Sequence, residues 1–248
     1  MAGHSKWSTI KRKKAATDAK RGKMFTRLLK EIQVAARMGG GSVDGNPRLK
    51  TAVDNAKSSS VPGDNIDRAI KRGTGDLEGV DYEQIIYEGY GPGGVAIMVT
   101  TLTDNKNRTV AEVRHAFSRG NGSLGTTNSV AFQFDEKGLF TFPSEGITEE
   151  QVFEVLLEAG AEDIVEEDGT WIITSQVSDF GAVRDAAAKL SAELQAELKL
   201  IPNINLKVAG DDAQALLRLI DLLDDLDDVQ DVVSNAEIDD LEYEKYDS

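Results

Sequence analysis

Apolar side chains recur at helical spacing in three short segments near the start of the chain. In the first segment they stand three and four positions apart, at Phe25, Leu28, Leu29, Ile32 and Ala35 or Ala36. This pattern stops at the glycines 39–41. In the second segment Asn46 is the expected N-cap and Pro47 the first helical residue, and the buried stripe is expected at Leu49, Ala52, Val53 and Ala56. A third, short helix is expected to begin near Pro62 and to end before Gly73. Such short helices can bury their stripes only against one another, so they predict a small helical domain.

After these helices the pattern changes to short runs typical of strands. The runs "YEQIIYEGY" and "GVAIMVTTLT" are joined by the turn "GPGG", and "NKNRTVAEVRHAF" follows as a helix. "SVAFQF" and "KGLFTF" are expected to pair as a hairpin around "DEKG". From "GLFTF" onward the order is β-α-β-β-α-β, which is the order of a ferredoxin-like plait. A further β-α-β follows Pro202.

The element order predicts an α+β multidomain fold. It consists of an N-terminal three-helix domain and two ferredoxin-like α/β domains, one inserted into the other. The expected divisions are a basic arm 1–23, a helical nucleic-acid-binding domain 24–77, a discontinuous α/β domain 78–135 with 204–240, an inserted α/β domain 136–203 and an acidic tail 241–248. The arm contains few apolar residues, so we expect it to be mobile or weakly helical when free.

Charge is distributed unevenly along the chain. The 248 residues have a formal net charge of −15. Residues 1–72 nevertheless hold 17 Lys and Arg against 6 Asp and Glu, a net of +11, whereas the rest holds 11 against 37, a net of −26. This asymmetry is typical of a polyanion-binding segment attached to an anion-repelling body. The alternative is that the cations only solubilise a helical face, but the run "KRKK" repels itself and does not fit that pattern.

The sequence lacks the residues that several kinds of catalytic and metal site require. The chain has no cysteine and only two histidines, His4 and His115, so thiol chemistry and familiar zinc spacings are excluded. "GYGPGG" matches a dinucleotide loop in letters but leads into a strand-like run, which favours a turn. The acidic stretch "DLLDDLDDVQD" lacks EF-hand spacing and is typical of an amphipathic helix. We therefore expect no catalytic residue, metal, cofactor or small-molecule substrate. No apolar run is long enough for a membrane helix and no signal peptide is evident, which favours the cytoplasm.

The candidate nucleic-acid-binding residues lie mainly in the basic end. They are Lys6, Trp7, Lys11, Arg12, Lys13, Lys14, Lys20, Arg21, Lys23, Arg27, Lys30, Arg68, Lys71 and Arg72. Trp7 could stack on a base or anchor the arm, and the last two cations also suit a helix C-terminus. A weaker second patch is expected at Lys106, Arg108 and Arg114, where Arg or Asn could instead cap a helix.

The chain also resembles a known family. "AGHSKWSTIKRKKAATDAKRGKMFTRLLKEI", "NPRLKTAVDNAKSSSVPGDNIDRAIKRG", "YEGYGPGGVAI" and "DNKNRTVAEVRHAF" resemble, in order, motifs of the YebC/PmpR family, which includes mitochondrial translational activators of a cytochrome oxidase subunit. The similarity covers essentially the whole chain. One departure is Asn128, where many members have glycine, but Asn also tolerates the left-handed conformation. The resemblance implies three domains and neither enzyme activity nor a cofactor. It also implies two descriptions of function, as a DNA-binding transcriptional regulator or as a factor acting on ribosomes at proline-rich stretches.

Three functions remain for comparison. We favour a ribosome-associated translation factor that binds ribosomal RNA or tRNA through its basic end, because a Lys/Arg arm suits irregular RNA surfaces. The alternative is a regulator that binds promoter DNA, for which the short third helix has few base-reading side chains: Asn65, Arg68, Lys71 and Arg72. An enzyme using a cleft between the α/β domains is disfavoured, since cysteine, most histidines and a phosphate loop are missing.

Overall fold

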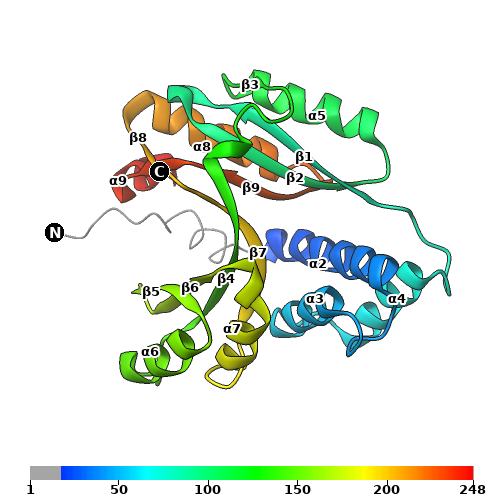
Figure 1. Cartoon of the computed structure of the whole chain (residues 1–248). Helices are drawn as coiled ribbons and strands as arrows, with labels where there is room; N and C mark the ends of the chain where they lie inside the picture. Colours follow the sequence, from blue (N-terminus) through cyan, green and yellow to red (C-terminus); the bar gives the residue numbers. More distant parts are fainter. Residues whose placement is uncertain (1–17, 248) are drawn as a thin grey trace. The chain divides into compact units, whose positions relative to one another are not determined.

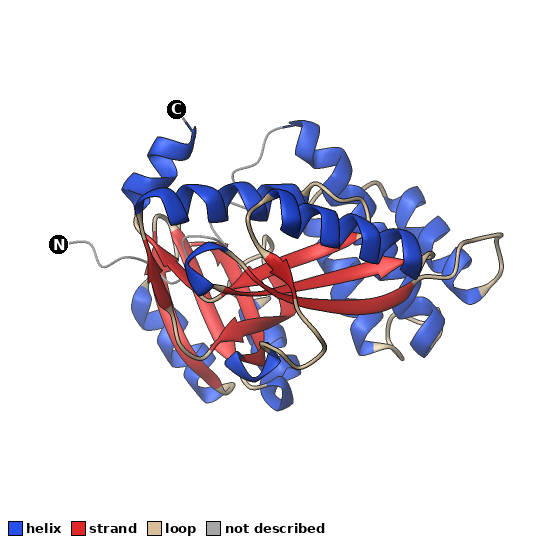
Figure 2. Ribbon diagram, turned by 90° about the horizontal axis from the view of Figure 1, so that it is seen from above, coloured by secondary structure: helices blue, strands red, loops and turns tan. Residues whose placement is uncertain are grey.

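The computed structural model describes residues 18–247 and shows a mixed α+β protein (Figures 1 and 2). The chain folds into two compact units. The first unit contains Val80–Asp135 and the chain from Ile201 on, together with the first turns of the first described helix up to Met24. The second unit contains Phe25–Gly79 and Glu136–Leu200. The sequence-based domain limits stay a prediction, because the two units group the helical segment with the inserted segment.

Three helices form where the apolar pattern predicted them, but the first begins at Asp18, within the expected arm 1–23, and the third continues through Gly73 to Thr74. They are α2 (Asp18–Gly39), α3 (Pro47–Ser58) and α4 (Gly63–Thr74). The side chain of Asn46 is the N-cap of α3, where its Oδ1 accepts from the Leu49 N–H at 3.1 Å. Its Nδ2 also donates to the carbonyl oxygens of Ala35 and Gly40, at the end of α2. One asparagine therefore starts α3 and satisfies carbonyls at the end of α2.

The helices bury their stripes against one another. The shared core is formed by Ile32, Ala35, Ala36, Leu49, Ala52, Val53, Ala56, Val61, Ile66 and Ala69. Phe25, Leu28 and Leu29 pack against this core and are partly buried. The predicted stripe of the second helix is buried in full.

The inserted segment is a ferredoxin-like plait. Its elements are β4 (Phe134–Pro143), α6 (Glu149–Glu158), β5 (Ala161–Glu167), β6 (Thr170–Ser175), α7 (Phe180–Ala187) and β7 (Gln195–Pro202). The strand order β5-β6-β4-β7 places the first and third strands of the plait in the middle of the sheet. Phe140, Phe142, Leu156 and Ile173 are among the side chains buried between the sheet and the two helices. The predicted β-α-β-β-α-β order is confirmed.

The predicted hairpin around "DEKG" is wrong. Residues 134–143 form one continuous strand, drawn as the long green arrow of β4 in Figure 1, and Gly138 pairs with Ser175 of β6. Residues 131–133 before it form a 3-10 turn. A tight hairpin needs a positive φ in its turn, and the positive φ occurs earlier, at Asn128 (64°). The chain therefore turns before the strand and not within it.

The first unit contains the other α/β part. Its elements are β1 (Glu83–Tyr90), β2 (Ala96–Thr103), α5 (Lys106–Arg119), β3 (Ser123–Leu124), β8 (Leu206–Val208), α8 (Gly210–Asp224), β9 (Val229–Ser234), β10 (Ala236–Ile238) and α9 (Asp240–Asp247). The sheet order is β3-β1-β2-β9, and β8 pairs in parallel with β10 in a separate small sheet. The segment "INLKVA" is thus a strand outside the main sheet, and the short β3, which the hydrophobic pattern does not reveal, occupies an edge. The fold class is as expected: a three-helix segment and two ferredoxin-like α/β parts, one inserted into the other.

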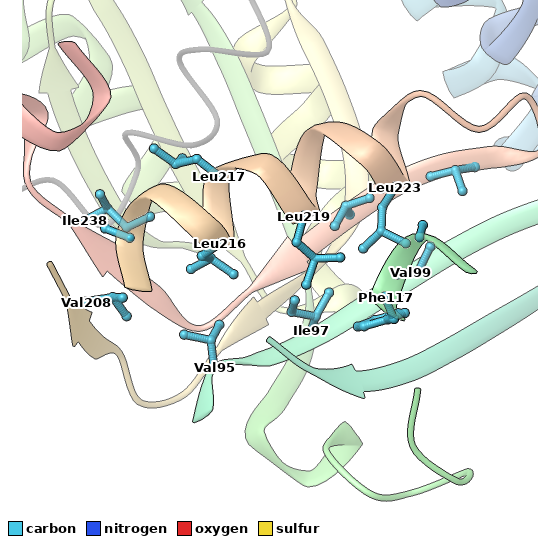
Figure 3. Packing of buried hydrophobic residues seen from close by; sticks show 14 of the residues in the cluster. Val95, Ile97, Val99, Phe117, Val208, Leu216, Leu217, Leu219, Leu223 and Ile238 are labelled. Atoms are coloured by element: carbon cyan, nitrogen blue, oxygen red, sulfur yellow. The ribbon is translucent and has the colours of Figure 1, made fainter. Parts of the chain in front are cut away.

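Two glycines of this unit allow α5 to pack closely against α8 and against the sheet. Figure 3 shows Leu216, Leu219 and Leu223 of α8 beside Ile97 and Phe117. A Cβ added at Gly120 would lie 2.6 Å from the Leu219 Cβ, and one added at Gly89 would lie 2.6 Å from the Phe117 ring. The backbone comes this close only because glycine has no side chain.

The segment "GYGPGG" is a turn between two strands, as predicted. Gly93 and Gly94 have φ values of 72° and 77°, and the Gly91 N–H donates to the Val95 carbonyl at 2.8 Å. The segment leads directly into β2 and not into a helix. It therefore lacks the helix N-terminus that holds a dinucleotide pyrophosphate.

Candidate nucleic-acid interface

The predicted basic arm lies largely outside the described residues. This applies to Lys6, Trp7, Lys11, Arg12, Lys13 and Lys14. Lys20 and Arg21 are in the first turns of α2. The described part of the candidate interface therefore begins with the later cations of α2.

Three cations of α2 are half-buried along the helix. They are Lys23, Arg27 and Lys30. Lys23 Nζ lies 3.7 Å from the carboxylate of Asp225, whose side chain is 82% exposed. An ion pair with so exposed a partner contributes little to stability.

The cations of α4 are exposed, and two of the three lie in its last turn. Arg68, Lys71 and Arg72 all face solvent. The helix ends there because Gly75 takes a left-handed conformation with φ 87°. Cations in the last turn also complement the helix dipole. Asp64 and Asp67 lie in the N-terminal half of the helix together with Arg68, so Lys71 and Arg72 at the C-terminal end are best placed for a phosphate backbone.

The outer face of α3 is occupied by the inserted plait. The Asn55 side chain donates to the Ala196 carbonyl at 2.6 Å and accepts from the Ala196 N–H at 3.0 Å. Arg184 Nη1, in α7, donates to Thr51 Oγ1 at 2.9 Å. Gln195 and Ser58 are also hydrogen-bonded. A reading helix must present one face to the major groove, and this face of α3 is already in contact with protein.

The predicted second patch, on α5, is partly neutralised by carboxylates. Lys106 Nζ lies 2.7 Å from Glu83. Arg108 Nη2 donates to Asp228 at 2.6 Å and to Asp104 at 2.8 Å, and these hydrogen bonds raise the pKa of the guanidinium. Because both are paired, they offer less charge to a phosphate than their number suggests. Arg114 is exposed on the same helix.

A buried carboxylate that the sequence analysis did not single out organises a loop of the first unit. Glu88, on β1, is only 6% exposed. It accepts from the backbone N–H groups of Asn128, Val130 and Ala131 at 2.6, 2.8 and 2.9 Å. Burial alone would raise the pKa of Glu88, but these hydrogen bonds outweigh it and the pKa is lowered. The loop ends in Phe132, which is 74% exposed. The feature of the sequence that could have indicated this loop is the stretch 120–134, which contains no charged side chain.

The described residues hold few groups suited to metal binding or catalysis. No cluster of three or more His, Asp or Glu side chains within residues 18–247 is arranged to hold a metal ion. His115 is exposed on α5. Among the helices that the structure describes, none has the length and apolar character needed to cross a bilayer.

The fold and its charge define a class of protein: a cationic helical segment joined to two acidic ferredoxin-like α/β parts. Two family models match the chain. Residues 5–76 match the TACO1/YebC protein N-terminal domain, and residues 82–236 match the TACO1/YebC second and third domain. The chain belongs to the TACO1/YebC family.

Relatives over the full length agree with this. The chain is 56% identical to "Probable transcriptional regulatory protein HRM2_04000" of Desulforapulum autotrophicum, over 98% of this chain and 99% of the relative. It is 54% identical to a "Probable transcriptional regulatory protein" of Gemmatimonas aurantiaca, over 97% and 98% of the two chains. A crystal structure of a conserved hypothetical protein, Aq1575 from Aquifex aeolicus, matches with a TM-score of 0.86 and 43% identity, over 94% of this chain and 97% of that one. The relatives' names support a regulatory role.

Proposed function

We propose that this protein is a non-enzymatic, nucleic-acid-binding regulator of gene expression. The cations of the N-terminal region, on the arm and on α2 and α4, bind phosphates. Phosphate contacts supply most of the sequence-independent affinity for nucleic acid and make it depend on salt. The acidic remainder, with a net charge of −26 after residue 72, keeps other surfaces away from the same polyanion.

The favoured target is RNA on the ribosome, and the favoured role is relief of stalling at proline-rich stretches. The observation that carries the preference for RNA is the contact of α3 with the inserted plait, through Asn55 and Thr51. It leaves α4 as the remaining short helix that could read a DNA groove, and α4 carries Asp64 and Asp67 on its exposed surface. Acids there repel a DNA backbone, whereas an irregular RNA surface can be contacted by the basic end without an inserted helix.

The alternative is a DNA-binding transcriptional regulator. The names of the relatives favour it, and the exposed Arg68, Lys71 and Arg72 of α4 could still contact DNA. Sequence-specific binding to a promoter requires side chains that form paired hydrogen bonds with base edges, as Arg does with guanine.

Crosslinking to nucleic acid in cells, followed by sequencing of the attached fragments, separates the two. Ribosomal RNA or tRNA fragments support the favoured role, and enriched promoter DNA supports the alternative. Ribosome profiling of a deletion strain then tests the finer proposal, since unchanged ribosome occupancy at proline runs would rule it out. A purified protein that binds neither ribosomes nor DNA would contradict both.

A further inference from the structure

One loop of the first unit presents an aromatic ring to solvent. Phe132 is 74% exposed in the 3-10 turn Ala131–Gln133, and Ile204 is 75% exposed. Their two segments are joined by a backbone hydrogen bond between adjoining residues, in which the Asn203 N–H donates to the Gln133 carbonyl at 2.9 Å. Exposed apolar side chains that gather in one place mark interaction sites, whereas single ones are normal on a protein surface.

The loop that carries Phe132 is held firmly on its inner side. The Glu88 carboxylate accepts three of its backbone N–H groups, and the Tyr90 hydroxyl donates to the Ser129 carbonyl at 2.8 Å. Asn128 has a φ of 64°, a conformation that Asn tolerates better than most residues. Phe132 therefore sits on a pre-organised turn, which lowers the entropy lost on binding.

The far end of the turn is fixed as well. The Gln133 side chain accepts from Asn235 Nδ2 at 3.0 Å, and Asn235 in turn accepts from the Ala96 N–H at 2.9 Å. These bonds attach the turn to the start of β2. A buried carboxylate and a network of amides thus hold an exposed phenylalanine in place.

The surroundings of Phe132 in the sequence carry no charge. Residues 120–134 and 200–206 contain no Asp, Glu, Lys or Arg, in a chain of which 29% is charged. Thr126, Thr127 and Asn128 on the same loop are exposed and can donate and accept hydrogen bonds. The unit is acidic, but the loop itself has no carboxylate that would repel the phosphates of a nucleic acid.

We propose that this loop binds an unpaired nucleobase, with Phe132 as the stacking surface and Thr126, Thr127 and Asn128 as contacts to the base edge. Single-stranded RNA is recognised in this way, by aromatic stacking and by hydrogen bonds to exposed edges. A protein interface of ordinary size needs about 20 to 30 residues a side, whereas this loop offers one exposed apolar side chain among short polar ones, with Ile204 on the neighbouring segment. The proposal rests on the proposed function, because the cations of the N-terminal region supply the phosphate contacts and the loop adds the base.

The test uses the full chain and a fluorescently labelled single-stranded oligoadenylate, with binding followed by anisotropy at low salt. Phe132→Leu keeps an apolar side chain but removes the ring, and it is expected to weaken binding about 5- to 100-fold, as expected when one base no longer stacks. Phe132→Trp keeps the ring and is expected to bind within about 2-fold of the original protein. Asn128→Gly preserves the left-handed backbone and removes only the amide, with an expected weakening of about 2- to 10-fold. Thermal unfolding of each variant checks that the fold is intact.

The outcomes separate this inference from the proposed function. Equal affinity of Phe132→Leu and the original protein overturns the inference, and so does an equal weakening in the Leu and Trp variants. A Phe132→Leu protein that binds oligoadenylate normally but no longer cosediments with ribosomes also overturns it, in favour of a protein partner. If the original protein binds neither oligoadenylate nor ribosomes, the proposed function fails as well.

Discussion

The side-chain amide of Asn55 pairs with the backbone of Ala196, 141 positions away, through one donated and one accepted hydrogen bond. Asn55 lies on α3 and Ala196 on β7, an edge strand of the inserted sheet. The asparagine thus satisfies an N–H and a C=O that an edge strand would otherwise expose. This pair of hydrogen bonds joins the helical segment to the inserted plait in one compact unit.

Replacing Asn55 with alanine should destabilise the protein. Both hydrogen bonds disappear and two partly buried backbone groups are left to find water, which costs about 1–3 kcal/mol. Urea unfolding of the full chain measures the change. Asp54→Ala, at an exposed position of the same helix, is the matched control and should change stability by less than about 0.5 kcal/mol. Equal stability of Asn55→Ala and the original protein would mean that the Asn55 side chain contributes nothing.

Reversing the charge of Lys11, Arg12, Lys13 and Lys14 to glutamate should abolish nucleic-acid binding and leave the fold intact. For duplex DNA, each phosphate that the protein no longer neutralises reduces the slope of log affinity against log salt concentration by about 0.9. Few apolar side chains lie in this part of the sequence, so the unfolding midpoint should not move. Anisotropy with RNA and DNA at several salt concentrations measures the slope.

The control for this charge reversal is Lys189→Glu with Lys207→Glu, at two exposed lysines of the acidic region. This control variant should bind nucleic acid almost as well as the original protein, because the two lysines lie outside the basic end. A binding defect in the control but not in the N-terminal variant would show that the binding surface was misplaced.

Glu88→Gln should destabilise the first unit most strongly near neutral pH. The carboxylate accepts three backbone hydrogen bonds, and hydrogen bonds to a charged group contribute about 1.5–3 kcal/mol. The pKa of Glu88 is lower in the folded protein than its ordinary value. Its contribution is therefore complete above the unfolded pKa, near 4.5, and is lost as the pH falls through the lower folded value.

The check is urea unfolding of both proteins from about pH 7 to about pH 3. The stability difference between the original protein and Glu88→Gln should be constant above about pH 5 and should shrink in more acidic solution. A difference that stayed the same over the whole acidic range would show that packing, and not the charge, accounts for the effect.

Gly120→Ala should destabilise the packing of α5 on α8. The new Cβ would lie 2.6 Å from the Leu219 Cβ and 2.9 Å from its Cα, and such overpacking costs about 1–3 kcal/mol. Gly181→Ala is a useful comparison, because it lies in helix α7 with nothing within 4 Å of the added Cβ. It should stabilise the protein by about 0.5–1 kcal/mol. Thermal unfolding of both variants measures the two opposite shifts, and shifts of the same sign would contradict the packing argument.

The helices were predictable because their signals are local. Asn46 and Pro47 mark the start of α3 within two residues, and the stripe from Leu49 to Ala56 repeats at the helical period. The β-α-β-β-α-β order of the inserted plait was predictable for the same reason. The hairpin expected at "DEKG" does not form, because pairing of the strand with β6 through Gly138 and Ser175 keeps it continuous and outweighs the local turn preference of these residues.

The candidate site was only partly predictable. The sequence locates the cations but not their partners, so it could not reveal that Arg108 is paired with Asp228, 120 positions away. Nothing in it indicated that Glu88 holds the loop from Asn128 to Ala131. The sequence shows that residues 120–134 contain no charged side chain. This feature points to a binding loop only once the structure shows that Phe132 is exposed.

The amino-acid sequence alone determined the uneven charge along this protein, its N-terminal helices, the order of elements in the inserted plait and its family, because charge, apolar period and motifs are written in neighbouring residues. Only the tertiary structure decided that Asn55 closes the edge at Ala196, that β8 pairs outside the main sheet, and that Glu88 holds the turn bearing Phe132. Each of these depends on a hydrogen bond or strand pairing between residues about 30 to 140 positions apart. No local pattern encodes such a pairing, since it forms only when the whole chain has folded.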